Sequence, residues 1–247
     1  MSKNSSQSSA SGSFDNTAHN QQIKNMFGSI ARGYDLLNHT LSLGFDVYWR
    51  HVLVSSLSTV PEGIFLDLAA GTFDVSLALA KAYPSRRIFG ADLCLPMLRE
   101  GLPKLEKRPG RVLPLNADAY HLPLADNSVA AITVSFGLRN MVPRLPALAE
   151  MHRVLRPGGR LCVLEFGSAR SKVWFGLYNF YLTGILPRIG GMLSGDRRAY
   201  DYLARTIIEF PSADELAGEM REAGFAAVAC KRLSGGIVYV HSADKFL

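Results

Sequence analysis

The sequence predicts an α/β fold built on a largely parallel β-sheet that helices cover on both faces. Short apolar runs typical of buried strands alternate with segments long enough for helices, and this alternation is characteristic of parallel sheets. The strands are expected at residues 64–69, 87–91, 112–115, 129–136 and 160–166. The helices between them are expected at residues 75–83, 96–105 and 143–155, the last ending before the Pro-Gly-Gly of residues 157–159.

Length and composition indicate one globular domain. The chain has 247 residues, of which 48% are hydrophobic and 19% charged, and this excludes collagen-like, coiled-coil and wholly disordered proteins. Residues 1–22 are rich in Ser, Asn and Gln and carry no targeting signal, so a disordered tail and a cytoplasmic location are expected. Residues 23–247 are expected to form the domain, with a helical cap at 23–57, a helical lid at 167–206, a helix at 213–223 and a closing hairpin at 226–232 and 237–241.

Within the cap, apolar residues at helical spacing predict two helices separated by a polar turn at residues 38–44. The three cysteines stand far apart and form no C-x-x-C pair, so neither a disulfide framework nor a zinc site is expected. The formal net charge of +6 suits a partner with negative charge, which could be nucleic acid, anionic lipid or a phosphate-bearing ligand.

The turn after the first strand predicts a nucleoside site. Small residues there, Gly71 among them, let a ligand approach the backbone, and Asp92 at the end of the next strand is placed to bind ribose hydroxyls. Gly71 is the only glycine of the turn, so the G-x-G-x-x-G fingerprint of dinucleotide sites is missing. The pattern D-x-A-x-G-x-F that begins at Asp67 instead resembles the D-x-G-x-G-x-G turn of S-adenosylmethionine-dependent methyltransferases.

Longer motifs extend this resemblance over most of the chain, from about residue 23 to residue 243. They comprise residues 27–39, 41–44, 49–50, 67–74, 135–140, 150–159, 164–166, 186–188, 194–196, 200–203, 223–225 and 235–238. Together these segments resemble the ubiquinone/menaquinone biosynthesis C-methyltransferase family. The resemblance implies a class I, Rossmann-like fold with a seven-stranded sheet, S-adenosylmethionine as the methyl donor and the ring of a prenylated quinol as the substrate.

The family pattern also implies which residues contact S-adenosylmethionine. All of them follow strand ends and so share one edge of the sheet: Thr72, Asp92, Asn116, Ala117 and Ser135. Asp67 either contacts S-adenosylmethionine as well or only stabilises the turn. Residues 194–196 and Gly235-Gly236 look more like the menaquinone members, which favours demethylmenaquinol as substrate. The alternative is the 2-methoxy-6-polyprenyl-1,4-benzoquinol of ubiquinone biosynthesis.

One departure from the family pattern bears on the cofactor. Phe73 stands where the family usually has a third glycine. Its side chain either crowds the cofactor or points back against the following helix. The first orientation would favour a protein of another class, a quinol-binding or scaffold protein that has lost cofactor binding and has no catalytic activity.

Methyl transfer to a ring carbon requires alignment of the two reactants and control of the proton of a quinol hydroxyl. We expect Arg139 to stabilise the developing phenolate and Asn140 to orient it, because both follow Ser135 at the mouth of the site. Arg139 could instead pair with Asp67 or Asp118. Further candidates for the proton step are Tyr34, Asp35, His39 and Tyr200. The alternative is a packing role for the two tyrosines and a capping role for His39.

The apolar segment 173–186 reads either as a core helix or as a lid over the isoprenoid tail. Basic residues at positions 172, 188, 197 and 198 flank it and predict peripheral contact with an anionic membrane surface. A nucleic-acid methyltransferase is disfavoured, because Ser-Phe-Gly-Leu-Arg-Asn replaces the Asn-Pro-Pro-aromatic motif after the fourth strand and no dense basic run is present. The oligomeric state is open, a homo-oligomer included.

Overall fold

The fold is organised around one seven-stranded sheet. The structure is a computed structural model and describes residues 17–106, 110–167 and 197–246. The strand order is β3-β2-β1-β4-β5-β7-β6. β1 to β5 pair in parallel, whereas β7 runs antiparallel to both β5 and β6, so the sheet is mostly parallel as predicted. The strands are β1 (Ile64–Leu68), β2 (Ile88–Asp92), β3 (Val112–Asn116), β4 (Val129–Ser135), β5 (Leu155–Phe166), β6 (Ala226–Leu233) and β7 (Val238–Asp244).

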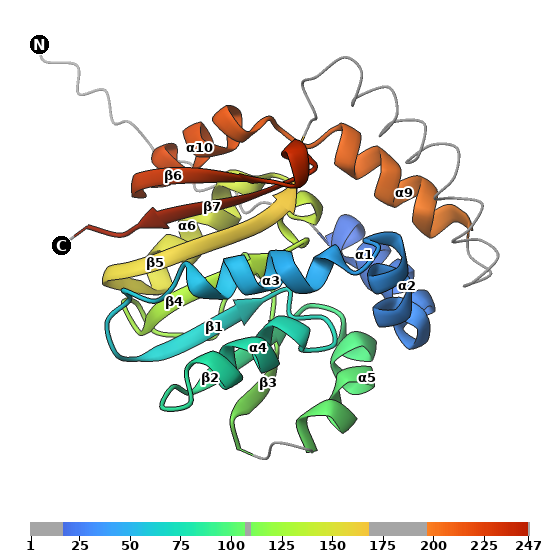
Figure 1. Ribbon diagram of the computed structural model, residues 1–247, viewed down its shortest axis with the longest axis horizontal. Coiled ribbons are helices and arrows are strands. Elements are labelled where there is room, and N and C mark those ends of the chain that lie inside the picture. Colours follow the sequence, from blue (N-terminus) through green and yellow to red (C-terminus); the bar gives the residue numbers. More distant parts are fainter. Residues whose placement is uncertain (1–16, 107–109, 168–196, 247) are drawn as a thin grey trace, which may run out of the picture.

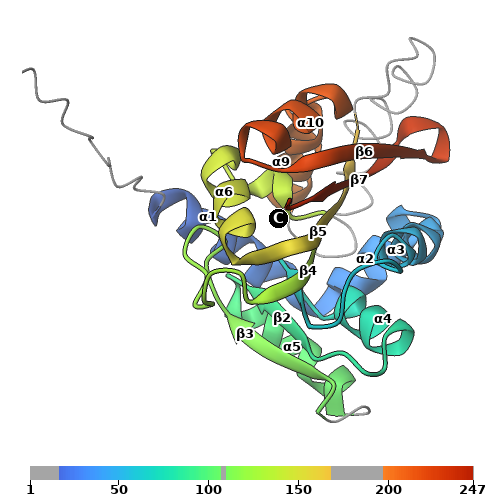
Figure 2. The same ribbon diagram turned by 90° about the vertical axis from the view of Figure 1, so that its left-hand side faces the viewer.

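Helices cover both faces of the sheet, because successive strand residues point to opposite sides (Figures 1 and 2). Leu66 of β1 belongs to a buried cluster with residues of α6 (Arg144–Val154) and α10 (Ala213–Glu222). The neighbouring Phe65 belongs to a second cluster with residues of α3 (Phe45–Ser55), α4 (Asp74–Ala82) and α5 (Leu95–Glu106). These two apolar layers form the core.

The N-terminal cap departs from the prediction in two places. Its first helix, α1 (Thr17–Ile30), begins inside the segment 1–22 that composition assigns to a disordered tail. Two polar side chains of this segment, His19 and Asn20, hydrogen-bond to residues outside α1. Such contacts leave no apolar pattern in the sequence, so composition does not predict the start of the helix. The cap also contains a 3₁₀ turn, Ala31–Gly33, which separates α1 from α2 (Tyr34–Leu41), so three α-helices replace the expected two. The turn before α3 is shorter than predicted and ends at Gly44, whose φ of 78° suits glycine.

β5 begins earlier than predicted. Helix α6 ends at Val154 and the strand starts at Leu155, so the Pro-Gly-Gly stretch lies within the strand instead of before it. The pairing with β4 shifts register across this stretch, which marks a bulge. Gly158 and Gly159 exchange backbone hydrogen bonds with Lys245 at 2.8 and 3.0 Å, so the bulge is tied to the end of the chain.

The parallel strands end on the side of the sheet where α1, α2 and α9 (Arg197–Ile208) lie (Figure 1). Most of the expected lid at 167–206 lies outside the described residues, as does the apolar segment 173–186. Among the residues that the structure does describe, no helix combines the length and the apolar character needed to cross a membrane.

Candidate functional site

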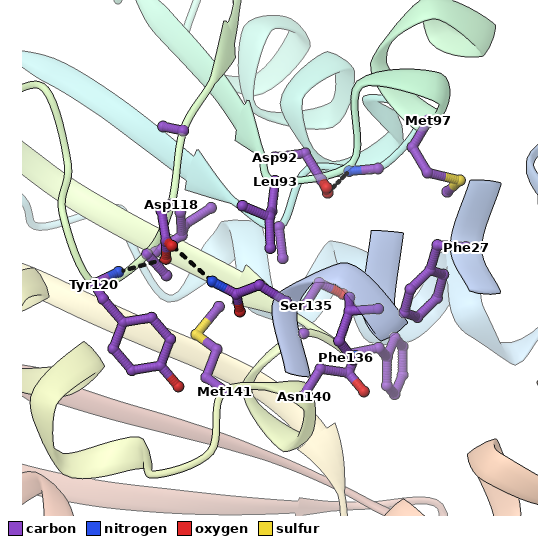
Figure 3. A pocket seen from close by; sticks show the side chains of 18 of the residues that line it. Phe27, Asp92, Leu93, Met97, Asp118, Tyr120, Ser135, Phe136, Asn140 and Met141 are labelled. Atoms are coloured by element: carbon purple, nitrogen blue, oxygen red, sulfur yellow. Dashed lines mark hydrogen bonds between the residues drawn. The ribbon is translucent and has the colours of Figure 1, made fainter. Parts of the chain in front are cut away.

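A pocket lies beyond the carboxyl ends of the parallel strands, where an open α/β sheet binds its ligands (Figure 3). α1 and α2 contribute to its wall from the side of the cap. Its lining residues are Asn20, Ile23, Phe27, Tyr34, Leu68, Ala69, Gly71, Asp92, Leu93, Met97, Ala117, Asp118, Ala119, Tyr120, Ser135, Phe136, Gly137, Asn140 and Met141. The wall is mainly apolar, and its few polar groups come from the loops after the strands.

Asp92 is the carboxylate at the end of β2. Its two oxygens accept hydrogen bonds from the backbone N–H groups of Gly71 and Cys94, each at 2.8 Å. Burial raises the pKa of Asp92, although these hydrogen bonds favour the charged form. The carboxylate is therefore held between the turn after β1 and the loop after β2, and it lines the pocket.

Asp118 is a second pocket carboxylate, considered from sequence only as a partner of Arg139. Its oxygens accept hydrogen bonds from Asn20 Nδ2 at 2.8 Å and from the backbone N–H of Tyr120 at 3.0 Å. Asn20 itself lies on α1, so a residue expected in the tail completes this part of the wall. The sequence did contain a signal for this residue. Asp118 lies two residues beyond the end of β3, at the same edge of the sheet as Asp92.

The loop after β4 supplies the third side of the pocket, with Ser135 and Asn140 as its polar residues. The backbone carbonyl of Asn140 lies 2.9 Å from His19 Nε2, and its side-chain oxygen accepts a hydrogen bond from Tyr202 of α9 at 3.2 Å. Gly137 is required here, since a Cβ atom at this position would lie 2.4 Å from that of Ala69. The loops after β1 and β4 therefore meet without a side chain between them.

Tyr34 reaches the pocket from the first turn of α2. Its ring packs edge-on against Phe27, with centroids 6.0 Å apart, and approaches Gly71 across the pocket. Burial raises the pKa of Tyr34, while the positive charge of Arg139 acts in the opposite direction. Its hydroxyl is therefore protonated at neutral pH and can donate a hydrogen bond.

Three residues expected to contact the cofactor do not line the pocket and make contacts within the protein. The Thr72 hydroxyl donates to Asp35 Oδ1 at 2.5 Å. Asn116 donates from Nδ2 to the carbonyl oxygens of Asp92 and Leu93, at 2.8 and 3.1 Å, and so holds the loop after β2. Asp67 is buried on the face of the sheet that α4 covers, and it accepts from the hydroxyls of Ser76 at 2.6 Å and Thr133 at 2.9 Å.

These hydrogen bonds match the second of the two roles considered for Asp67, that of tying down the turn. Burial, opposed by the hydrogen bonds from Ser76 and Thr133, raises its pKa to about 7. A carboxyl group in this position is therefore partly protonated near neutral pH. Of the residues predicted to bind the cofactor, the pocket wall itself contains Gly71, Asp92, Ala117 and Ser135.

Arg139 lies deeper than expected, and its partner is neither Asp67 nor Asp118. Only 6% of it is exposed, and Nη1 lies 3.0 Å from Oε1 of the buried Glu165 on β5. The backbone N–H of Arg139 also donates to Glu165, at 3.3 Å. The guanidinium sits over the ring of Phe166, and within the described part of the chain its Nε has no hydrogen-bond partner. Arg139 thus adds charge beside the pocket without lining it.

His39 lies outside the pocket, in the last turn of α2. Its side chain is 59% exposed, and Nδ1 is 3.0 Å from Asp46 Oδ1 at the start of α3. This contact corresponds to the capping role that was considered for it. The side chain of Tyr200 lies outside the described residues. In residues 17–106, 110–167 and 197–246, no group of His, Cys, Asp and Glu side chains could hold a metal ion.

Phe73 points away from the pocket. Its ring is fully buried in the cluster between the sheet and α4 and α5, and it packs against Gly90 of β2 and Gly101 of α5. The backbone of Phe73 has a φ of 70°, the left-handed conformation that explains why glycine is common at this position. The second of the two predicted orientations is therefore the one found, and the ring leaves the cofactor turn unobstructed.

Comparison with known proteins assigns the family. The model of the ubiE/COQ5 methyltransferase family matches residues 15–245. The chain belongs to the ubiE/COQ5 methyltransferase family. The ubiquinone/menaquinone biosynthesis C-methyltransferase UbiE of Syntrophotalea carbinolica is 44% identical over 92% of this chain and 95% of that protein. The demethylmenaquinone methyltransferase of Thermus thermophilus is 41% identical over 89% of this chain and 100% of that protein.

Solved structures share the fold of this ubiE/COQ5 family member at low sequence identity. The [4+2]-cyclase SpnF superposes with a TM-score of 0.68 at 16% identity, over 92% of this chain and 96% of that chain. A SAM-dependent methyltransferase from Aquifex aeolicus gives a TM-score of 0.58 at 18% identity, over 78% of this chain and 88% of that chain. These likenesses confirm the class I methyltransferase fold. With the family assignment, they make the chain a methyltransferase whose methyl donor is S-adenosylmethionine.

Proposed function

We propose that the protein methylates a ring carbon of demethylmenaquinol and so forms menaquinol. The observation that carries this proposal is the rigid Asp92 carboxylate in an apolar pocket at the carboxyl ends of β1, β2 and β4. Relatives named demethylmenaquinone methyltransferase, from Mycobacterium marinum at 42% identity and Thermus thermophilus at 41%, support the choice of quinol.

The donor set of the pocket fits S-adenosylmethionine. Two carboxylates, Asp92 and Asp118, face a space into which no basic side chain projects from the described wall. Such a site would repel a pyrophosphate but accepts hydrogen bonds from hydroxyl and amino groups, and it attracts a positive sulfonium. We assign Asp92 to the ribose hydroxyls and Asp118 to the adenine amino group, with Gly71, Ala117 and Ser135 as close backbone neighbours.

When bound, S-adenosylmethionine supplies an electrophilic methyl group on a sulfonium, which becomes a neutral thioether as the carbon–carbon bond forms. The ring carbon supplies the electron pair and then loses its hydrogen as a proton. We assign Tyr34 and Asn140 to the quinol oxygens, because both line the pocket and carry hydrogen-bond donors. Asn140 lies beside Phe136 and away from Asp118 and Tyr120 (Figure 3), and Tyr34 packs against Phe27. Their donors would orient the ring and stabilise negative charge on its oxygen.

Arg139 acts on this charge from behind the wall. Its guanidinium is fixed by Glu165 and lowers the pKa of Tyr34 relative to burial alone. We therefore propose that Arg139 stabilises the phenolate indirectly, through the electrostatic field of its guanidinium and through Tyr34. Direct contact with the ring is assigned to Asn140. Thr72, Asn116 and Asp67 serve the site by fixing its loops.

The test is an anaerobic assay of the purified protein with S-adenosylmethionine and chemically reduced demethylmenaquinol. Product mass should increase by one methylene unit with the quinol and remain unchanged with the oxidised quinone, because only the reduced ring is electron-rich. Methylation of 2-methoxy-6-polyprenyl-1,4-benzoquinol alone would replace demethylmenaquinol with that substrate. No product from either quinol, together with no binding of S-adenosylmethionine, would support the scaffold alternative.

We also propose that the cap contacts the membrane surface in which a prenylated quinol resides. Large apolar side chains are unusually exposed around the turn between α2 and α3: Leu36, Leu43, Phe45, Val47 and Tyr48, with Leu43 exposed at 84%. Concentrated apolar exposure of this kind is typical of interaction surfaces. The acidic residues of this segment, Asp35 and Asp46, are paired with Lys104 and Arg50, so they do not oppose approach to lipid.

Vesicle sedimentation tests this contact. The protein should pellet with vesicles of phosphatidylcholine and phosphatidylglycerol, and the double variant Leu43→Ser/Phe45→Ser should remain in the supernatant. Leu113→Ser is the matched control, because Leu113 is also exposed but lies on the edge strand β3. Equal binding of the double variant and wild type would exclude the α2–α3 turn as the contact.

A further inference from the structure

Lys104 joins three segments that are distant in the sequence. It lies in the last turn of α5, and its Nζ is 2.5 Å from Asp35 Oδ2 at the start of α2. The same nitrogen is 2.6 Å from Asp74 Oδ1 at the start of α4 and donates to the Thr72 hydroxyl at 3.1 Å. One ammonium group therefore binds α2 of the cap, the cofactor turn and the start of α4.

The contacts of Lys104 continue into a longer chain of charges. Arg50 of α3 pairs with Asp74 on one side and with Asp46 on the other. Burial acts to raise the pKa of Asp74, but the hydrogen bond from Lys104 and the charge of Arg50 hold it below its usual value. Asp74 is therefore charged at neutral pH and able to hold both cations.

Both ends of the Lys104 contact lie next to the pocket wall. Asp35 follows Tyr34, and Thr72 follows Gly71, and each of these neighbours lines the pocket. Tyr34 and Gly71 also approach each other, since a Cβ atom on Gly71 would lie 3.9 Å from Tyr34 Cε1. The Thr72 hydroxyl donates to Asp35 and so closes a triangle with Lys104.

We propose that Lys104 is a positioning residue, which clamps α2 onto the cofactor turn and thereby fixes the distance between Tyr34 and Gly71. The proposal rests on this pocket being the site of S-adenosylmethionine. Lys104 does not touch the ligand, so its effect reaches the site through Asp35 and Thr72. Without the ammonium group, Asp35 and Asp74 would repel each other, and α2 would move more freely against the domain.

The tests use the full chain with Lys104→Met, which preserves the length of the side chain and removes its charge, and Lys104→Arg, which preserves the charge. Lys81→Met is the matched control, because Lys81 is an exposed lysine on α4 away from the pocket. Calorimetry with S-adenosylhomocysteine should give a Kd raised roughly two- to fivefold for Lys104→Met, in line with loss of a half-buried ion pair. Lys104→Arg should recover most of the affinity, and Lys81→Met should equal wild type.

A second readout needs no ligand. Hydrogen–deuterium exchange of the backbone amides of α2 should be faster in Lys104→Met than in wild type and Lys81→Met. If Lys104→Met leaves both the Kd and this exchange unchanged, the clamp is refuted. If wild type binds no S-adenosylhomocysteine, the cofactor assignment of the pocket fails, while the exchange experiment still decides whether Lys104 holds α2. Should Lys104→Met not fold, Asp35→Asn gives the same tests from the other partner.

Discussion

A Cβ atom on Gly101 would lie 2.5 Å from Cδ2 of Phe73, so the ring fills the space beside α5 that any larger residue would need. On its other side, a Cβ atom on Gly90 would lie 2.7 Å from Cδ1 of the same ring. The phenyl group is thus held between β2 and α5. A residue that departs from the family pattern in the cofactor turn has become part of the core.

Substitution of Phe73 should therefore lower stability and leave cofactor binding unchanged. Phe73→Ala should reduce the free energy of unfolding by about 3–5 kcal/mol, the usual cost of removing a buried ring. Phe73→Gly should lower the free energy of unfolding by about 1 kcal/mol less than Phe73→Ala does, because glycine adopts the left-handed backbone conformation without strain. Urea denaturation measures both values. An intact stability with a much weaker Kd for S-adenosylhomocysteine would place the ring at the cofactor instead.

Asp92→Asn should weaken the binding of S-adenosylhomocysteine about 10- to 100-fold, since each charged hydrogen bond contributes about 1.5–3 kcal/mol. The amide group also places a donor beside the N–H groups of Gly71 and Cys94, which donate to the carboxylate now. Calorimetry gives the Kd. Asp126→Asn, at an exposed acidic residue paired with Arg153, is the control and should bind like wild type.

Tyr34→Phe and Asn140→Ala should reduce kcat for the quinol about tenfold or more, because each removes a donor assigned to the quinol oxygen. Phe retains the edge-on contact with Phe27, so the Kd for S-adenosylhomocysteine should change little in Tyr34→Phe. Steady-state kinetics on reduced demethylmenaquinol measure the effect. Tyr83→Phe, which loses a hydroxyl that donates to the carbonyl of Val54, should retain full activity.

Asp67 should make stability depend on pH. Its folded pKa of about 7 lies above the ordinary value of 3.8, so the folded state binds the proton more tightly than the unfolded state. The stabilisation is complete below about pH 4 and is lost as the pH rises through 7, amounting to roughly 2–4 kcal/mol. Asp67→Asn removes this titration. Urea denaturation from pH 4 to pH 8 measures the free energy of unfolding of wild type and of Asp67→Asn. The wild-type value should fall relative to that of Asp67→Asn as the pH rises, and a constant difference would contradict the prediction.

The sequence predicted the sheet and the edge that carries the site, because strand patterning and the ends of parallel strands are local signals. It could not tell which side chains at that edge face the pocket. Asp67 and Asp92 both stand at strand ends, yet Asp67 is directed at Ser76 and Thr133 in the core. That orientation depends on neighbouring strands and helices, which the spacing of residues does not encode.

Arg139 illustrates the same limit over a longer range. Its position after Ser135 predicted a place at the mouth of the site, but Glu165, on the neighbouring strand β5, pairs with the guanidinium inside the protein, and Arg139 does not line the pocket. The start of α1, before Ile23, was missed for a different reason. This part of the helix contacts the rest of the protein through the polar residues His19 and Asn20, and a search for apolar periodicity does not register them.

The hydrogen bond from Asn20 to Asp118 has a practical consequence for preparing the protein. A shortened chain that begins at Ile23 would look conservative by composition, yet it would lack the lining residue Asn20 and the contact between His19 and Asn140. Trimming of the N-terminus into α1 therefore alters the pocket, and a protein shortened in that way should be compared with the full chain before its activity is interpreted.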